Sequence, residues 1–270
     1  MTHLLKLEWL KQKDYILFKL LVIAYLVFLP AMLFVGKKID MGPNAPFNPQ
    51  TQFFHFPTIW GWLGYIGNWM VFFVLGFMAV LMVTNEYSNR TLRQNVITGL
   101  KREEFFWSKL IFIAALATAA TLYYFLCALV IGLLHVDDTL YFSTVFKDAD
   151  LIPRYWLMAM GYMSFGLLVG ILIKRTGIAL FIFLAYSMVI EVVWRWVVHF
   201  NIFKNITMSF YPLNAMEDLA PVPVAEFASD MLKNHGFRLL LTPWEAVITT
   251  VVYTSLFFFW SYKRLKNSDL

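Results

Sequence analysis

The chain has 270 residues, of which 60% are hydrophobic and 19% aromatic, whereas only 14% are charged. Soluble domains carry about 25% charged residues, so this composition excludes an ordinary water-soluble protein and predicts several membrane spans. In a membrane protein the sidedness of the basic residues indicates orientation, so the formal net charge of +5 does not indicate a nucleic-acid partner. The single cysteine, Cys127, excludes an intrachain disulfide and a cysteine-based metal site.

Six long apolar runs predict an all-α, polytopic membrane protein whose six transmembrane helices form one domain over residues 1–270. The runs are residues 16–35, 61–84, 110–134, 155–173, 177–200 and 246–262. A hydrophilic lead, residues 1–15, precedes the first run, which shows no small-residue cleavage site and should stay in the protein. Charges inside the runs are limited to Lys19, Glu191 and Arg195.

The basic residues predict the orientation of these helices. When the 22 Lys and Arg residues are assigned to the two sides of the six runs, 14 fall on one side and 8 on the other. Lys and Arg concentrate on the cytoplasmic side, so both termini and the loop at 85–109 should be cytoplasmic. We expect a bacterial inner membrane, with the basic lead contacting anionic membrane lipid.

The outer connection, residues 201–241, predicts an amphipathic helix before the last span. Its apolar side chains recur at helical spacing, and Gly236 could terminate the helix. These apolar residues are Val224, Phe227, Ala228, Met231 and Leu232. The helix would lie on the outer leaflet, either with a role of its own or merely capping the bundle. After it, Thr242, Pro243 and Glu245 form a helix-start signal for the last span.

No catalytic or nucleotide-binding motif is present. The sequence lacks a phosphate-binding loop, a His-Glu-x-x-His zinc motif and a Gly-x-Ser-x-Gly nucleophile motif. The sequence therefore predicts that this chain is not an enzyme and binds no metal or cofactor. If the protein uses ATP, a separate chain must bind the ATP and Mg²⁺.

The loop at 85–109 is long and patterned like structured protein. Thr91 to Gln94 form a capping box that predicts a helix from Leu92 to Thr98, and Gly99 suits the left-handed conformation that ends helices. A helix of about two turns is unstable alone in water. We therefore expect its apolar ridge, which includes Val96 and Ile97, to dock on another protein.

Taken in order, this loop resembles the corresponding segment of permease subunits of type 2 ABC exporters, which have the ABCG-like transmembrane fold. The matching features are Glu86 at the end of the second span, Thr91-Leu92-Arg93-Gln94, Thr98-Gly99, Arg102, Glu104-Phe105-Phe106 and Lys109. The resemblance extends over the six spans, the lead and the long outer connection. It departs at Gly99, where the family commonly has proline.

The resemblance implies a permease that dimerises with a second copy or a homologous permease and recruits ABC ATPase subunits. The substrate should be hydrophobic or amphipathic. Two sets of residues are implied. The short helix would couple to the ATPase through Thr91, Leu92, Arg93, Gln94, Val96, Ile97 and Gly99. Ion pairs among Glu86, Arg102, Glu104 and Lys109 would organise the loop.

Glu191 and Arg195 are four residues apart on one face of the fifth run. Ionised groups at this depth are costly, so we expect them to pair with each other or with a neighbour. They could shape the translocation path or its outer gate, or they could form a structural ion pair beside Trp194 and Trp196. His199 is expected at the interface rather than on a metal, because no partner has ligand spacing.

Two other classes of function stay open. An intramembrane hydrolase or protease would use Glu191, His199 and His135, although their spacing does not match a metal site. A membrane scaffold or sensor would bind a cytoplasmic partner through residues 85–109 without transporting anything. The glycines of the second run, Gly61, Gly64, Gly67 and Gly76, predict close helix packing, either inside one subunit or at a dimer face.

Overall fold

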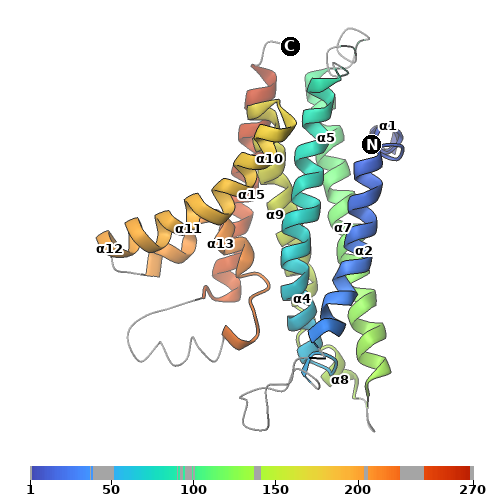
Figure 1. Ribbon diagram of the computed structural model, residues 1–270, viewed down its shortest axis with the longest axis vertical. Helices are drawn as coiled ribbons and strands as arrows, with labels where there is room; N and C mark the ends of the chain where they lie inside the picture. The colour runs from blue at the N-terminus through green and yellow to red at the C-terminus, as the bar shows by residue number, and fades with distance from the viewer. Residues whose placement is uncertain are drawn as a thin grey trace.

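The computed structural model describes residues 2–36, 38, 52–89, 91, 94, 99, 101–136, 141–203, 206–225 and 240–267. Over these residues the regular structure is helical and contains no strand, which confirms the predicted all-α class. Figure 1 shows long helices side by side, with the start of α1 and the end of α15 at the same end of the bundle. We call this the terminal end, and the end near α8 the opposite end.

The first half of the chain supplies three long helices. A short helix, α1 (Thr2–Gln12), precedes α2 (Ile16–Gly36). The second long helix is continuous and comprises α4 (Thr58–Met70), a π-helical turn η1 (Val71–Leu75) and α5 (Gly76–Ser88). The third is α7 (Arg102–Leu134), and a short α8 (Phe142–Val145) follows it.

The second half contains a straight fourth helix, a bent fifth helix and a final helix. The fourth is α9 (Leu151–Ile173). The fifth consists of α10 (Thr176–Ala185), η2 (Tyr186–Ile190), α11 (Glu191–Val193), η3 (Trp194–His199) and α12 (Phe200–Phe203). Then come the 3₁₀ turn η4 (Ile206–Phe210), the short α13 (Pro212–Glu217) and α15 (Pro243–Lys266).

Five of the described helices are long and apolar enough to cross a membrane: Ile16–Gly36, Thr58–Ser88, Arg102–Leu134, Leu151–Ile173 and Thr176–Phe203. They correspond to the first five predicted runs. α15 has 24 residues and packs along α9, but threonines, serines and its basic last turn make it less apolar. The sixth span therefore stays a prediction.

The core of the bundle lies around α9, which contacts α5, α7 and α15. Glycine permits the closest approach, since a Cβ added to Gly166 would lie 2.6 Å from the carbonyl oxygen of Gly76. Gly67 faces the ring of Tyr155, and Gly76 also faces the ring of Phe183. These glycines of the second helix thus serve packing inside the subunit, the first of the two predicted uses.

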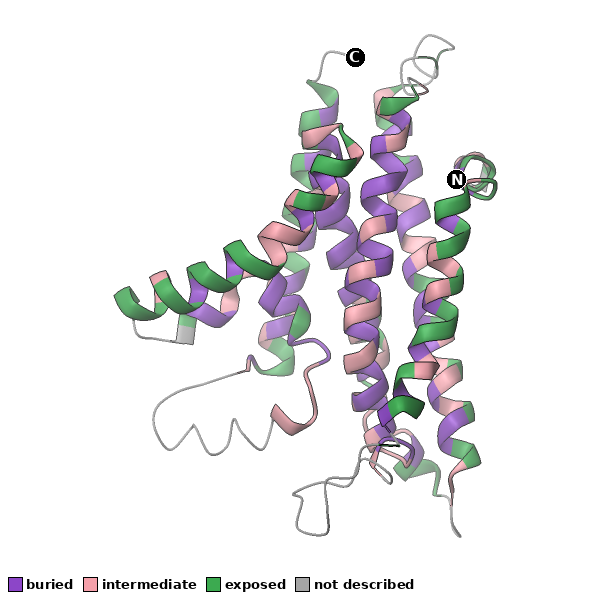
Figure 2. Ribbon diagram, viewed as in Figure 1, coloured by how far each residue is buried: buried purple, intermediate pink, exposed green. Residues whose placement is uncertain are grey.

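The fifth helix leans away from the bundle beyond α10 (Figure 1). Two π-helical segments, η2 and η3, interrupt it, and such segments bend helices because they insert extra residues into a turn. Much of this helix is exposed (Figure 2). Glu191 and Arg195 are buried. This helix therefore presents a long apolar surface to lipid or to another subunit.

A helix begins where the sequence predicts when the capping residues are close together in the chain. Thr242 and Glu245 form the predicted capping box at the start of α15, with the Thr242 backbone N–H donating to Glu245 Oε2 at 2.8 Å. Two predicted helices cannot be compared, because residues 92–93 and 95–98 and the apolar positions Phe227 to Leu232 lie outside the described residues.

Candidate functional site

A cluster of four charges, three of them buried, lies at the terminal end and joins three helices. The side chain of Lys109, on the second turn of α7, is 1% exposed and lies between Glu8 of α1 and Glu86 of α5. Lys109 Nζ donates to Glu8 Oε2 at 2.5 Å and also to Glu86 Oε1. Lys11 Nζ donates to the same two carboxylates, at 3.0 Å to Glu8 and 3.1 Å to Glu86. We call these four residues the charge cluster.

The surroundings of Glu8 favour its ionised form. The Ser108 hydroxyl donates to Glu8 Oε1 at 3.1 Å, and the ring of Phe105 lies 4.9 Å from Lys109 Nζ. Burial raises the pKa of Glu8, but the positive charges of Lys109 and Lys11 outweigh this effect and hold the pKa below its ordinary value. Two carboxylates and two ammonium groups therefore neutralise one another where the 89–101 connection leaves α5 and enters α7.

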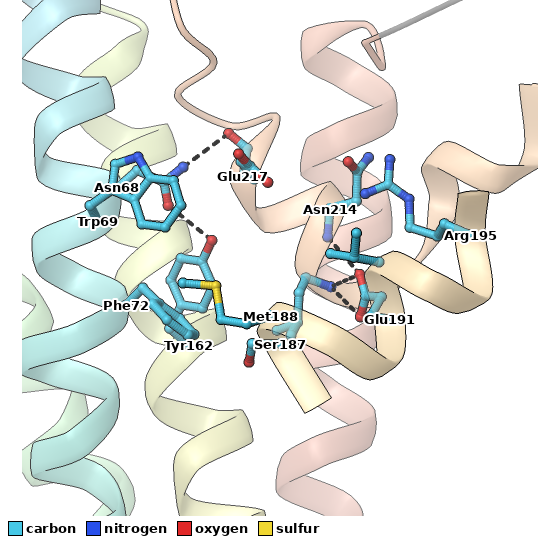
Figure 3. Close-up of a pocket in the computed structure, with 12 residues that line it drawn as sticks. Asn68, Trp69, Phe72, Tyr162, Ser187, Met188, Glu191, Arg195, Asn214 and Glu217 are labelled. Carbon is cyan, nitrogen blue, oxygen red and sulfur yellow. Dashed lines mark hydrogen bonds between the residues drawn. The ribbon is translucent and has the colours of Figure 1, made fainter. Parts of the chain in front are cut away.

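A cavity of about 230 Å³ lies farther from the terminal end, between the second, fourth and fifth helices and α13 (Figure 3). Aromatic side chains form one wall: Trp69, Phe72 and Tyr162. Asn68 connects this wall to α13, because it accepts from the Tyr162 hydroxyl at 2.9 Å and donates to the Glu217 carbonyl at 3.4 Å. The cavity thus combines an apolar wall with a polar rim.

The polar side of the cavity contains Glu191 and Arg195, which bind a neighbouring segment rather than each other, the second of the two expected arrangements. The Glu191 carboxylate accepts backbone N–H bonds from Leu213 at 3.0 Å and from Asn214 at 2.9 Å, at the start of α13 (Figure 3). Arg195 Nε donates to the Met208 carbonyl at 3.0 Å. Both side chains therefore hold the segment 206–217 against the fifth helix.

The segment that follows the fifth helix explains why these two side chains bind a neighbour. The first N–H groups of a helix have no partner within it, and they attract a carboxylate. Pairing with each other would also need regular α-helical spacing, whereas η3 begins at Trp194, directly before Arg195. The sequence could not indicate which neighbour binds them, because these partners belong to residues 206–217.

Comparison with known proteins decides the family. The family model described as ABC-2 family transporter protein matches residues 4–211 of the chain. The chain belongs to the ABC-2 family of transporter proteins. The matched region runs from α1 to the start of α13, so it includes the charge cluster together with Glu191 and Arg195. The family resemblance read from the loop is confirmed.

A relative of this ABC-2 protein is the uncharacterized membrane protein YdbK of Bacillus subtilis (strain 168). The two are 30% identical over 105 residues, which is 38% of this chain and 43% of the relative. The chain thus matches less than half of the relative's length. Together with the apolar helices, the comparisons establish a transmembrane permease of the ABC transporter class.

The four residues expected to form ion pairs in this ABC-2 protein divide into two groups. Glu86 and Lys109 meet in the charge cluster. Arg102 instead donates to the Lys266 carbonyl at 2.7 Å, and Glu104 accepts from the Lys101 backbone N–H at 2.9 Å. α7 begins at Arg102, so Arg102 and Glu104 lie on its first turn, where Glu104 caps α7 and Arg102 binds the end of α15. Lys109 lies about two turns from the start of α7.

Glu8 and Lys11 are the members of the charge cluster that the sequence analysis missed. They stand three residues apart on α1, which is the spacing of an ion pair on one helix face. That spacing was an available signal. It could not reveal the partners, because Glu86 and Lys109 are far along the chain and come near only when α1 packs against α7.

Among the seven residues expected to couple to an ATPase, the structure describes Thr91, Gln94 and Gly99. The Thr91 hydroxyl donates to the Glu86 carbonyl at 3.4 Å, and Gln94 is exposed. Gly99 has a φ of 104°, a left-handed value that suits glycine as predicted. The other four, Leu92, Arg93, Val96 and Ile97, lie outside the described residues.

The histidines of the enzyme hypothesis contact different groups. His199 contacts the Thr207 hydroxyl at 2.8 Å and the Tyr211 hydroxyl at 3.1 Å, which helps to hold the segment after the fifth helix. His135 contacts the Ile131 carbonyl at 2.9 Å at the end of α7. Within the described ranges, no group of three His, Cys, Asp or Glu side chains is arranged to hold a metal.

Proposed function

We propose that this ABC-2 protein is the permease subunit of an ATP-driven exporter and works with separate ATPase subunits that bind ATP and Mg²⁺. The observation that carries the proposal is the charge cluster, which ties α1, α5 and α7 together at both ends of the 89–101 connection. The terminal end would face the cytoplasm of a bacterial inner membrane. Two permeases would form a dimer and recruit two ATPase subunits.

The charge cluster suits the transmission of a movement from the connection to the spans. Lys109 is shared by Glu8 and Glu86, so a displacement of α5 cannot leave α1 and α7 behind without separating buried charges. Breaking one partner from a buried ion pair is strongly unfavourable. A push on the connection would therefore move the ends of three helices as a unit.

The cavity of about 230 Å³ is the proposed place where this movement meets the substrate. One wall belongs to the second and fourth helices, and the other belongs to the fifth helix and α13. A tilt of the fifth helix would carry α13 with it, because Glu191 and Arg195 hold that segment. Aromatic side chains suit a hydrophobic or amphipathic substrate that has a polar group near Glu191.

The test compares Glu86→Gln with the parent in proteoliposomes that contain the ATPase partner. Glu86 is the contribution of α5 to the charge cluster, and its replacement leaves Lys109 paired with Glu8. We expect normal insertion and retained ATPase, with permease-stimulated hydrolysis reduced about tenfold, the effect of roughly 1.4 kcal/mol of lost coupling.

Glu104→Gln serves as the matched control, because Glu104 lies on the same end of the molecule and only caps α7. It should hydrolyse ATP like the parent. Parent-like hydrolysis by Glu86→Gln would contradict the transmission role of the charge cluster. A parent that binds the ATPase but never stimulates it would favour a scaffold instead.

A further inference from the structure

A second groove lies at the terminal end, between α9 and α15, away from the cavity and the charge cluster. It measures about 400 Å³ and is lined by Leu168, Leu172, Trp260, Lys263, Arg264 and Asn267. Leu168 and Leu172 are one turn apart near the end of α9, and the polar residues stand on the last turns of α15. The groove is therefore apolar toward the membrane interior and basic toward the helix ends.

The two cations of this groove have no acidic partner among the described residues. Lys266, their neighbour on α15, lies 3.8 Å from Glu103, whereas neither Lys263 nor Arg264 forms an ion pair with a described carboxylate. Lys263 Nζ lies 5.5 Å from the centre of the Trp260 ring. The groove thus offers two exposed positive charges beside an aromatic side chain.

The groove residues lie near the ends of α9 and α15, and this location indicates which kind of anion the groove binds. Trp side chains favour the membrane interface, and Lys and Arg extend from helix ends toward headgroups. The exposed side chain of Leu172 continues the same surface toward the membrane interior. A soluble anion would use the two cations and leave the leucine wall unused, whereas a lipid would contact both parts.

We propose that this groove binds one anionic phospholipid. Lys263, Arg264 and the Asn267 amide hold the phosphate, Trp260 lies at the level of the glycerol, and an acyl chain follows Leu168 and Leu172. Two cations facing one headgroup favour a net negative lipid over a zwitterionic one. The bound lipid would bridge α9 and α15 at the end where α15 meets the charge-cluster side of the bundle through Arg102 and Lys266.

The test counts bound lipid by native mass spectrometry of the full chain in detergent, titrated with phosphatidylglycerol. The variant Lys263→Gln/Arg264→Gln should bind the first lipid about 30-fold more weakly than the parent. The matched control Lys101→Gln/Lys174→Gln removes two charges from the same end but outside the groove and the basic lead, and should bind the first lipid like the parent. An equal loss in both variants would show general charge attraction and overturn the proposal.

Two further arms separate a lipid from a free anion. Leu172→Gln keeps both cations and should still weaken binding, because it removes part of the acyl wall. Glycerol phosphate should not displace the lipid. Undiminished binding by Leu172→Gln, or full displacement by glycerol phosphate, would overturn the lipid assignment. No ATPase is present in these measurements, so their outcome is independent of the proposed exporter function.

Discussion

At the residue scale, Lys109 shows most directly how the chain uses buried charge. An isolated ammonium group in an apolar interior is very unfavourable, and Glu8 and Glu86 offset that cost together. The pattern of charges could not be predicted in full from the sequence. Glu86 and Lys109 lie at the two ends of one loop, so an ion pair between them could be expected. Glu8 belongs to a lead whose position depends on tertiary packing.

This arrangement makes the loss of one charge worse than the loss of a matched pair. Lys109→Met leaves two carboxylates facing Lys11 alone, and should lower the free energy of unfolding by about 3–5 kcal/mol. Glu8→Gln/Lys109→Met leaves Lys11 paired with Glu86 and should recover a large part of that loss. Thermal melting of the purified variants in detergent measures both effects.

The pairing would be contradicted if the double variant lowered the melting temperature by the sum of the decreases caused by Lys109→Met alone and Glu8→Gln alone. Lys13→Met is the control for the loss of a lysine near α1, because Lys13 lies 4.0 Å from exposed Asp14 and outside the cluster. It should melt within a degree or so of the parent, as surface ion pairs contribute about 0–1 kcal/mol.

At the element scale, the long helices were predictable and the segment after the fifth helix was not. Apolar runs define the first five spans because a helix that crosses a membrane needs about 20 apolar residues. α7 begins eight positions before its apolar run, at Arg102, because Glu104 and Lys101 cap a polar first turn. The position of α13 depends on Glu191 and Arg195, and no local pattern of residues 206–217 reveals those partners.

The contacts of Glu191 predict that its removal loosens residues 206–217 from the fifth helix. Ser209 is buried beside the Met208 carbonyl that accepts from Arg195. In a Cys127→Ser background, Ser209→Cys should resist a membrane-impermeant maleimide. Adding Glu191→Ala removes the acceptor of two backbone N–H groups and should make Cys labelling at position 209 at least several-fold faster.

Thr144→Cys is the control in the same background, since Thr144 is exposed at the opposite end. Its labelling should be equally fast with and without Glu191→Ala. Unchanged protection of position 209 after Glu191→Ala would show that the carboxylate does not hold this segment in place.

At the scale of the whole molecule, the charge cluster and the cavity lie at different levels of the bundle. The terminal end contains the charge cluster, the 89–101 connection and the basic last turn of α15. The cavity lies farther along, with a wall formed by the leaning fifth helix. We propose that a cytoplasmic ATPase acts on the terminal end and that the helices carry the movement to the cavity.

The proposed exporter requires that an ATPase docks on the 89–101 connection. Val96 belongs to the apolar ridge expected from the sequence and lies outside the described residues. Placing a charge on that ridge should prevent docking, because burying an unpaired carboxylate in an apolar contact costs at least several kcal/mol. The spans do not involve this position, so membrane insertion should be unchanged.

The deciding measurement is ATP hydrolysis by the partner ATPase in proteoliposomes that contain either the parent or Val96→Asp, with Thr144→Asp at the opposite end as the control. We expect the parent and Thr144→Asp to retain and stimulate the ATPase, whereas Val96→Asp should insert normally but lose the partner or its stimulation. A Val96→Asp variant that binds and stimulates the ATPase like the parent would exclude docking at this ridge.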